Sequence, residues 1–167
     1  MQQPDGCKNP ITFFSLGTIH SPFHDIAGMP IQPNGARGIR GTVEVADQFA
    51  EGLKDLEGFA RIILIYSFHK CTGHELHVKP FLDPSPRGIF ATRSPRRPNA
   101  IGLSVVRLLS INGSTLSVED VDILDGTPLL DIKPYVPAFD AYPDSCSGWL
   151  ETVAHNAGSV RSDGRFR

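Results

Sequence analysis

Three arginines stand close together in a segment that two prolines stiffen. Arg93, Arg96 and Arg97 fall within five positions, and Pro95 and Pro98 fix φ and hold the residues before them in extended conformations. A guanidinium matches the geometry of a carboxylate or a phosphate, and a stiff loop loses little freedom when it binds such a group. A solvated basic turn is the alternative interpretation. The two prolines favour an anion-binding site.

A second group of polar residues lies within residues 124–137. Asp125 opens an Asp-Gly-Thr-Pro turn, in which aspartate accepts local backbone donors and glycine permits positive φ. Taken alone, these four residues predict a surface turn. Asp131 and Lys133 are two positions apart and would share one face of a strand, and Tyr135 follows between two prolines. This pattern favours a rigid pocket wall.

Four possible metal ligands follow the most apolar segment of the chain. His69, Cys71, His74 and His77 all carry side chains that zinc accepts. In an extended chain His69 and Cys71 share a face, whereas His74 and His77 point to opposite faces, so this spacing does not build a tetrahedral site. We therefore predict no metal and interpret His69 as a pocket residue at the end of a strand.

The charge balance limits what the surface can bind. The 167 residues include 16 Lys and Arg and 18 Asp and Glu, a net charge of −2, so any nucleic-acid contact must be a local patch. The 3 cysteines have no paired spacing, which argues against a disulfide framework. No apolar run reaches the roughly 20 residues that span a bilayer. Dinucleotide, P-loop and nucleophile-elbow motifs are also missing. We expect a cytoplasmic protein without membrane contact.

The segments that would position these residues have mostly the period of β-strands. Alternating or β-branched apolar runs predict strands at residues 12–19, 41–45, 61–68, 74–78, 101–111, 115–121 and 129–133. Asn112-Gly113 is a strong hairpin signal, so the strands on either side of it should pair antiparallel. One short helix is predicted at 48–56, with Asp47 as its N-cap and three apolar side chains on one face.

Many short strands, frequent glycine and proline, and one short helix predict a mainly β fold. We expect a small single-domain β-barrel with long loops. The predicted division is an N-terminal arm at residues 1–11, a barrel domain at 12–150 and a flexible C-terminal tail at 151–167. Residues 157–167 of that tail are polar and glycine-rich, which predicts disorder unless a partner orders them.

Two long motifs carry a family resemblance. They are Gly88-Ile-Phe-Ala-Thr-Arg-Ser-Pro-Arg-Arg-Pro-Asn-Ala-Ile-Gly-Leu-Ser-Val-Val and Asp125-Gly-Thr-Pro-Leu-Leu-Asp-Ile-Lys-Pro-Tyr. Shorter matches are Ile19-His-Ser-Pro-Phe, Gln32-Pro33 and Phe68-His69. Over roughly residues 13–145 the chain resembles the TsaA/YaeB family, also called TrmO.

The resemblance implies an S-adenosylmethionine-dependent methyltransferase that is built on a small β-barrel and works as a homodimer. The family's characterised substrate is tRNA that carries N(6)-threonylcarbamoyladenosine next to the anticodon, and the exocyclic nitrogen is methylated. Bacterial members that act on tRNA often carry an additional C-terminal segment, whereas this chain ends soon after the expected barrel.

The resemblance also implies a set of cofactor contacts. Carried over by position, they fall on Gln32, Pro33, Asn34, His69, Lys70, Arg93, Leu103, Asp125, Gly126, Thr127 and Pro128. Three positions depart from the family pattern. Asn34 stands where glycine is usual, Ala100 stands where proline is usual, and Lys70 is not the commonest residue at its position.

The chemistry of methyl transfer assigns roles to the predicted cofactor contacts. Transfer from a sulfonium is an in-line displacement, so positioning and exclusion of water supply much of the catalysis. Arg93 suits the cofactor's carboxylate, Asp125 suits a hydroxyl or an amine, and Leu103 and Pro128 suit an adenine face.

The acceptor side needs other groups. A ureido nitrogen is a poor nucleophile, and His69 and Asp131 are candidate bases by residue type. Arg96, Arg97 and Lys133 are predicted to contact tRNA phosphates. Pairing of the arginines with acidic side chains of the same chain is the alternative interpretation.

Two other functions stay open at this point. One is a methyltransferase that uses the same cofactor on a small molecule. The other is a non-catalytic RNA-binding β-barrel. The chain has only 1 Trp and 3 Tyr on which bases could stack, and this argues against that function.

Overall fold

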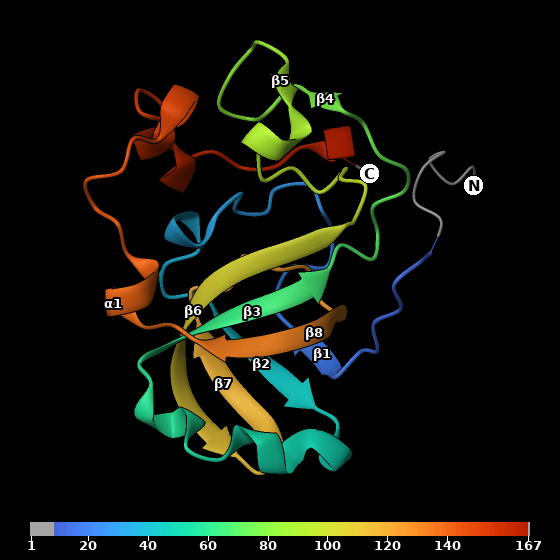
Figure 1. Cartoon of the computed structure of the whole chain (residues 1–167), viewed down its shortest axis with the longest axis vertical. Coiled ribbons are helices and arrows are strands. Elements are labelled where there is room, and N and C mark those ends of the chain that lie inside the picture. Colours follow the sequence, from blue (N-terminus) through green and yellow to red (C-terminus); the bar gives the residue numbers. More distant parts are fainter. Residues whose placement is uncertain (1–8, 167) are drawn as a thin grey trace.

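The structure is a computed structural model, and it describes residues 9–166. Its largest element is a closed barrel in the order β1-β2-β7-β6-β3-β8, in which neighbouring strands are antiparallel. The barrel strands are β1 (Gly17–His20), β2 (Arg40–Val45), β3 (Arg61–Ser67), β6 (Ile101–Asn112), β7 (Thr115–Glu119) and β8 (Thr127–Pro134). Figure 1 shows the barrel in the lower half of the view. The predicted fold class is confirmed.

The alternation of side chains along the strands explains the core. In β3, Ile62, Leu64 and Tyr66 turn inward and are at most 5% exposed, while the residues between them are partly exposed. Burial of such side chains is the main favourable contribution to folding. The barrel core comprises Ile19, Val43, Val45, Leu53, Ile62, Leu64, Tyr66, Val106, Leu116, Val118, Val121, Ile123 and Leu129.

The predicted hairpin forms between β6 and β7. Asn112 pairs with Thr115, and Gly113 and Ser114 form the two-residue loop. Gly113 has a φ of 59°, which glycine adopts without steric cost. The antiparallel pairing that Asn112-Gly113 predicts is confirmed.

Several strand boundaries differ from the prediction. The strand predicted at 12–19 is only β1 (Gly17–His20), and Phe13 and Phe14 before it are 62% and 78% exposed. The strand predicted at 115–121 ends at Glu119, because Asp120 has a φ of 71° and leaves the extended conformation. The strand predicted at 129–133 extends from Thr127 to Pro134, since it pairs with both β1 and β3. Of the predicted strand 74–78, only β4 (His77–Val78) forms, paired with β5 (Arg87–Gly88).

The short helix predicted at 48–56 differs from the structure in its continuity and in its type. The segment forms two 3-10 helices, Asp47–Leu53 and Leu56–Gly58, and Asp55 between them has a φ of 66° that interrupts any continuous helix. Asp47 does not cap the helix. Its carboxylate accepts a hydrogen bond from the hydroxyl of Ser114 instead, at 3.1 Å.

Long loops and short helical turns cover one side of the barrel. We call the segments 21–39, 68–100 and 148–166 the loop layer. It contains β4, β5 and the 3-10 helices Pro33–Gly35, Ile89–Ala91, Gly148–Leu150, Ala154–Gly158 and Gly164–Phe166. The α-helix α1 (Pro137–Asp140) lies between β8 and the last part of this layer. Figure 1 shows β4, β5 and the C-terminal turns together above β6.

The C-terminal tail differs from the predicted flexible segment 151–167. Phe166 is 6% exposed and packs edge-on against Phe81 at 5.2 Å between ring centroids. Ser162 exchanges backbone hydrogen bonds of 2.8 Å with residues 28–29, and its hydroxyl donates to Ile26. Polar composition predicts disorder only where the backbone finds no partner, and here a distant loop provides one.

Other expectations concern the ends of the chain and membranes. Most of the predicted arm at residues 1–11 lies outside the described residues. Within residues 9–166, none of the helices has the length and apolar character needed to cross a membrane.

Candidate active site

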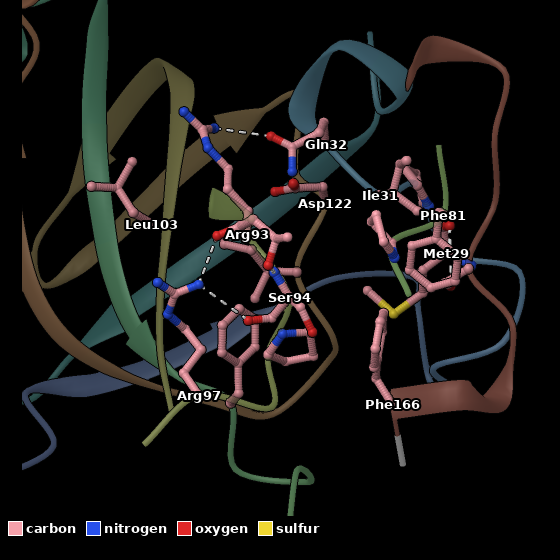
Figure 2. A pocket seen from close by; sticks show the side chains of 18 of the residues that line it. Met29, Ile31, Gln32, Phe81, Arg93, Ser94, Arg97, Leu103, Asp122 and Phe166 are labelled. Atoms are coloured by element: carbon pink, nitrogen blue, oxygen red, sulfur yellow. Dashed lines mark hydrogen bonds between the residues drawn. The ribbon is translucent and has the colours of Figure 1, made fainter. Parts of the chain in front are cut away.

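A cavity of about 910 Å³ lies where the loop layer meets the barrel. Its walls are largely apolar, and a few polar side chains from distant parts of the chain converge on it, as in many ligand sites. Figure 2 shows these side chains from close by. The lining residues come from within segments 26–34, 66–71, 80–82, 90–97, 101–103, 122–127 and 149–166.

Arg93 presents its guanidinium at one side of this cavity. Its Nη1 donates a hydrogen bond of 2.9 Å to Oε1 of Gln32, which comes from the first loop of the layer. Figure 2 shows both side chains near Asp122. Arg93 is exposed, so the rest of its fork is accessible to a bound anion.

Arg97 also lines the cavity, but its guanidinium is occupied within the loop. Nη1 donates to the backbone oxygen of Thr92 at 2.8 Å, and longer contacts of 3.4 Å reach the oxygens of Ile89 and Ser94. The guanidinium also lies 5.9 Å from the ring centre of Phe90. Arg97 therefore braces the loop that carries Arg93.

Three polar side chains form a hydrogen-bonded chain that runs from the barrel to the cavity. The hydroxyls of Tyr66 on β3 and Ser104 on β6 are 3.0 Å apart, and the hydroxyl of Ser104 donates to Oδ1 of Asp122 at 2.6 Å. Tyr66 and Ser104 are buried, whereas Asp122 is partly exposed on the cavity wall. Gly102 makes room for the phenol ring, because a Cβ there would lie 2.2 Å from Tyr66.

Burial changes the proton affinity of this chain. Burial raises the pKa of Asp122 to about 6, although the hydrogen bond from Ser104 and the positive charge of Arg93 both lower it. Burial also raises the pKa of the Tyr66 hydroxyl well above its ordinary value, and the negative charge of Asp122 raises it further. Tyr66 therefore stays a proton donor at neutral pH, while Asp122 is a stronger base than an exposed aspartate.

Ser94 contributes a polar atom that has no partner among the described residues. The residue is 7% exposed and lines the cavity, and its Oγ makes no hydrogen bond within residues 9–166. A buried hydroxyl without a partner is unfavourable, so a bound polar group would stabilise this position.

His69 lines the cavity. Burial lowers the pKa of its imidazole, and the positive charge of Lys70 lowers it further. His69 is therefore neutral at physiological pH and can accept a proton.

Most of the predicted cofactor contacts come together around the cavity. Those that line it are Gln32, Pro33, Asn34, His69, Lys70, Arg93, Leu103 and Thr127. Asp125, Gly126 and Pro128 are not among the lining residues. Pro128 pairs with Thr18 in the barrel, and Gly126 has a φ of 73° in the turn before β8.

Asp125 organises the neighbouring loop. Its Oδ1 accepts hydrogen bonds from the backbone of Ser21 at 3.1 Å and from Nδ1 of His20 at 3.2 Å. His24 lies 3.3 Å from the other carboxylate oxygen. The hydrogen bond from Ser21 is the main cause that lowers the pKa of Asp125. The carboxylate thus holds the start of the segment that leads to Gln32.

The structure does not bring Asp131 to the cavity. Its carboxylate lies 2.7 Å from Nζ of Lys133, two residues along β8. Arg96 forms an ion pair with Glu75 and also stays outside the lining. Each of the three cations predicted to contact phosphate, Arg96, Arg97 and Lys133, thus has an intramolecular partner.

The zinc alternative finds no geometric support in the described part of the chain. Within residues 9–166, no group of three or more His, Cys, Asp or Glu side chains is arranged to hold a metal ion.

Sequence reasoning missed Tyr66, Ser104, Asp122 and Ser94. One available signal is the alternation in β6, which turns Ser104 inward between Gly102 and Val106 although serine is polar. A polar residue at an inward position requires a buried partner, so this serine indicates a buried polar site.

Comparison with known proteins agrees with this geometry. Residues 18–141 match the family model of the tRNA-methyltransferase O N-terminal domain. A probable S-adenosyl-L-methionine-binding protein of Pyrococcus abyssi is 53% identical over 156 residues, which cover 93% of this chain and 85% of that protein. The tRNA (adenine(37)-N6)-methyltransferase of Escherichia coli K12 is 32% identical over 151 residues, which cover 84% of this chain and 64% of that enzyme.

A solved structure gives the same result. The crystal structure of TrmO from Pseudomonas aeruginosa superposes with a TM-score of 0.71 at 38% identity, over 84% of this chain and 63% of the other. This chain thus spans somewhat less than two thirds of the Escherichia coli and Pseudomonas aeruginosa proteins. The family model covers more than half of the chain, and the chain belongs to the tRNA-methyltransferase O N-terminal domain family.

Proposed function

We propose that this protein transfers a methyl group from S-adenosylmethionine to the N6 nitrogen of an adenosine in tRNA. The proposed acceptor is N(6)-threonylcarbamoyladenosine next to the anticodon. The observation that carries the proposal is a largely apolar cavity with an arginine fork on one side and a partly exposed carboxylate beside it. The same reaction class is supported by the similarity to a probable S-adenosyl-L-methionine-binding protein and to a tRNA (adenine(37)-N6)-methyltransferase.

The side chains around the cavity fit this cofactor. About 910 Å³ lies within the usual range of roughly 300–1,000 Å³ for small-molecule sites. Arg93 would hold the carboxylate, Leu103 at 50% exposure would cover the adenine face, and Ser94 would find a polar partner. When bound, the cofactor supplies a methyl group that a sulfonium activates. The chain itself contributes orientation and exclusion of water.

Calorimetric titration with S-adenosylmethionine tests the cofactor site. Arg93→Ala should weaken binding by roughly 1.5–3 kcal/mol, because a charged hydrogen bond to the carboxylate is lost. Arg107→Ala is the matched control, since Arg107 on β6 pairs with Glu119 at 2.6 Å and does not line the cavity. Equal affinity of the two variants would remove Arg93 from the site.

Labelled cofactor and purified RNA test the acceptor. We expect transfer to anticodon-stem RNA that carries the threonylcarbamoyl group and less transfer to unmodified RNA. Among the predicted phosphate contacts we retain Arg96 and Lys133, whose ion pairs are partly exposed and contribute little, so phosphate can compete for them. Arg97 is left out because backbone oxygens occupy its guanidinium.

A small-molecule acceptor is the second candidate. The intramolecular partners of Arg96, Arg97 and Lys133 favour it, because they leave less free positive charge for a nucleic acid. Labelled product in a small-molecule extract, without label in RNA, would support this candidate over tRNA.

The proposal includes a homodimer that covers the mouth of the cavity. Phe90 and Leu103 line the cavity and are 77% and 50% exposed, and Leu76, whose backbone bonds to Ile89, is 60% exposed. A second copy would bury these side chains, which favours two-fold association. Light scattering should show a dimer at micromolar concentration that Phe90→Asp dissociates. A wild-type monomer that binds the cofactor normally would contradict the dimer.

A further inference from the structure

Tyr66, Ser104 and Asp122 form one hydrogen-bonded chain, and both of its end residues line the cavity. It begins inside the barrel, crosses from β3 to β6 and ends at a carboxylate on the cavity wall. A barrel core needs no buried serine and phenol hydroxyl, since apolar residues of similar shape would fill the same space without polar groups to satisfy. The hydrogen-bonded chain therefore indicates a functional role for the carboxylate of Asp122 at its exposed end.

The direction of the hydrogens follows from the number of donors. Ser104 has one hydroxyl hydrogen, and the short 2.6 Å contact with the carboxylate of Asp122 takes it. The hydroxyl of Tyr66 must then donate to the oxygen of Ser104 at 3.0 Å. Both hydrogens point toward Asp122, so the chain orients the carboxylate through its Oδ1 oxygen.

We propose that Asp122 is the catalytic residue that accepts the proton of the acceptor nitrogen, and that Ser104 and Tyr66 are positioning residues for its carboxylate. This inference rests on the methyl transfer proposed above. It assigns the base to the cavity wall and not to Asp131, whose carboxylate is paired with Lys133 outside the cavity.

The atoms and electrons of the methyl transfer balance with Asp122 as the single base. The bond between sulfur and the methyl carbon breaks, and its electron pair stays on sulfur, which becomes a neutral thioether. The nitrogen's electron pair forms the new bond to carbon. The N–H proton passes to Asp122, its former bonding electrons remain on nitrogen, and the product nitrogen is neutral. The neutral carboxyl group then returns its proton to solvent at the cavity mouth.

The charged and titratable groups around Asp122 suit this task. Tyr66 faces it through Ser104 from β3, and Arg93 faces it from the arginine-bearing loop. Burial raises the pKa of Asp122 to about 6 and makes it more basic than an exposed aspartate, while the hydrogen bond from Ser104 and the charge of Arg93 lower this pKa. The neutral imidazole of His69 is the competing base at the same cavity.

Asp122→Asn keeps the shape of the side chain and removes its basicity. We expect the rate constant for methylation of RNA at saturating cofactor to fall by about 10²–10⁴-fold, the usual contribution of a general base. Affinity for S-adenosylmethionine by calorimetry should stay unchanged. Asp144→Asn is the matched control, since Asp144 is exposed and lies outside the cavity.

Titration gives a readout that needs no activity. Carbon-13 NMR of the side-chain carboxyl of Asp122 in the free protein should show a midpoint near pH 6. Ser104→Ala should move this midpoint upward, because the lost hydrogen bond stabilises the ionised form. The acidic limb of the pH–rate profile should move with it. Tyr66→Phe should move both in the same direction by less, because its hydroxyl acts through Ser104.

Four outcomes overturn the inference in distinguishable ways. If Asp122→Asn loses cofactor affinity but keeps its rate at saturation, Asp122 is a cofactor contact. If the rate falls in His69→Ala or Asp131→Asn and not in Asp122→Asn, the base lies elsewhere. A midpoint of Asp122 that Ser104→Ala does not move removes the positioning role. A wild-type protein that binds the cofactor and methylates no RNA overturns the proposed function, and this inference with it.

Discussion

The barrel and the loop layer of this protein are held together by different means. Each barrel strand has an antiparallel neighbour on both sides, and the side chains of the core that the barrel encloses are almost completely buried. The loop layer depends on short 3-10 turns, a small cluster around Val78, Ile89 and Phe166, and hydrogen bonds between segments far apart in sequence. The cavity lies between the two regions. Rigid strands thus position Ser104, and the layer contributes side chains such as Arg93 to the cavity lining.

Two core substitutions, one in each region, should lower the free energy of unfolding by different amounts. Leu64→Ala removes a side chain with no exposed area from the barrel core and should lower the free energy of unfolding by about 2–5 kcal/mol. Phe166→Ala removes a ring from the small cluster and should lower it by about 1 kcal/mol, because the tail can detach while the barrel stays folded. Urea denaturation measures both.

Hydrogen exchange separates a local effect from a global one. In Phe166→Ala the amide of Ser162, which donates to Met29 at 2.8 Å, should exchange faster while amides of β3 keep their protection. If Phe166→Ala destabilises the protein as much as Leu64→Ala does, the layer and the barrel form one cooperative unit and the comparison fails.

The same contrast explains which parts of the fold the sequence predicts. The alternation in β3 and the Asn112-Gly113 turn are local signals, and the structure confirms the strand and the hairpin. The predicted helix after Asp47 is interrupted because Asp55 adopts positive φ, which the apolar periodicity of the segment does not reveal. The ordered tail depends on a partner loop more than a hundred residues away, so its own polar composition is misleading.

The residues of the candidate site also divide into those that the sequence predicts and those that it does not. Arg93 and Leu103 of the first long motif and Gln32 of a shorter match all line one cavity, and only the family resemblance pointed to this grouping. The chain from Tyr66 to Asp122 could not be predicted from spacing, since three different segments contribute to it. Asp125 belongs to the second long motif, and its carboxylate accepts a hydrogen bond from the backbone of Ser21, which spacing in the sequence does not reveal.

The pH dependence of the free energy of unfolding distinguishes the cavity wall from the barrel core by a smaller effect. Burial raises the pKa of folded Asp122 to about 6 from an ordinary value of 3.8, so between these values the folded state binds more protons than the unfolded state. This contribution to the free energy of unfolding is therefore fully present below about pH 4 and is lost as pH rises through about 6. The carboxylate at the cavity wall thus destabilises the protein at neutral pH, unlike any residue of the barrel core.

Asp122→Asn should for this reason be more stable than wild type at about pH 7.5, with a difference on the order of 1 kcal/mol. The value is below the full effect of two pKa units, because the carboxylate is partly exposed and solvent screens its charge. The difference should vanish near pH 4, where the wild-type carboxyl group is protonated in the folded state. Thermal unfolding across this range measures it, with Asp144→Asn as the control. A variant that is less stable than wild type at neutral pH would mean that the hydrogen bond from Ser104 and the charge of Arg93 outweigh burial.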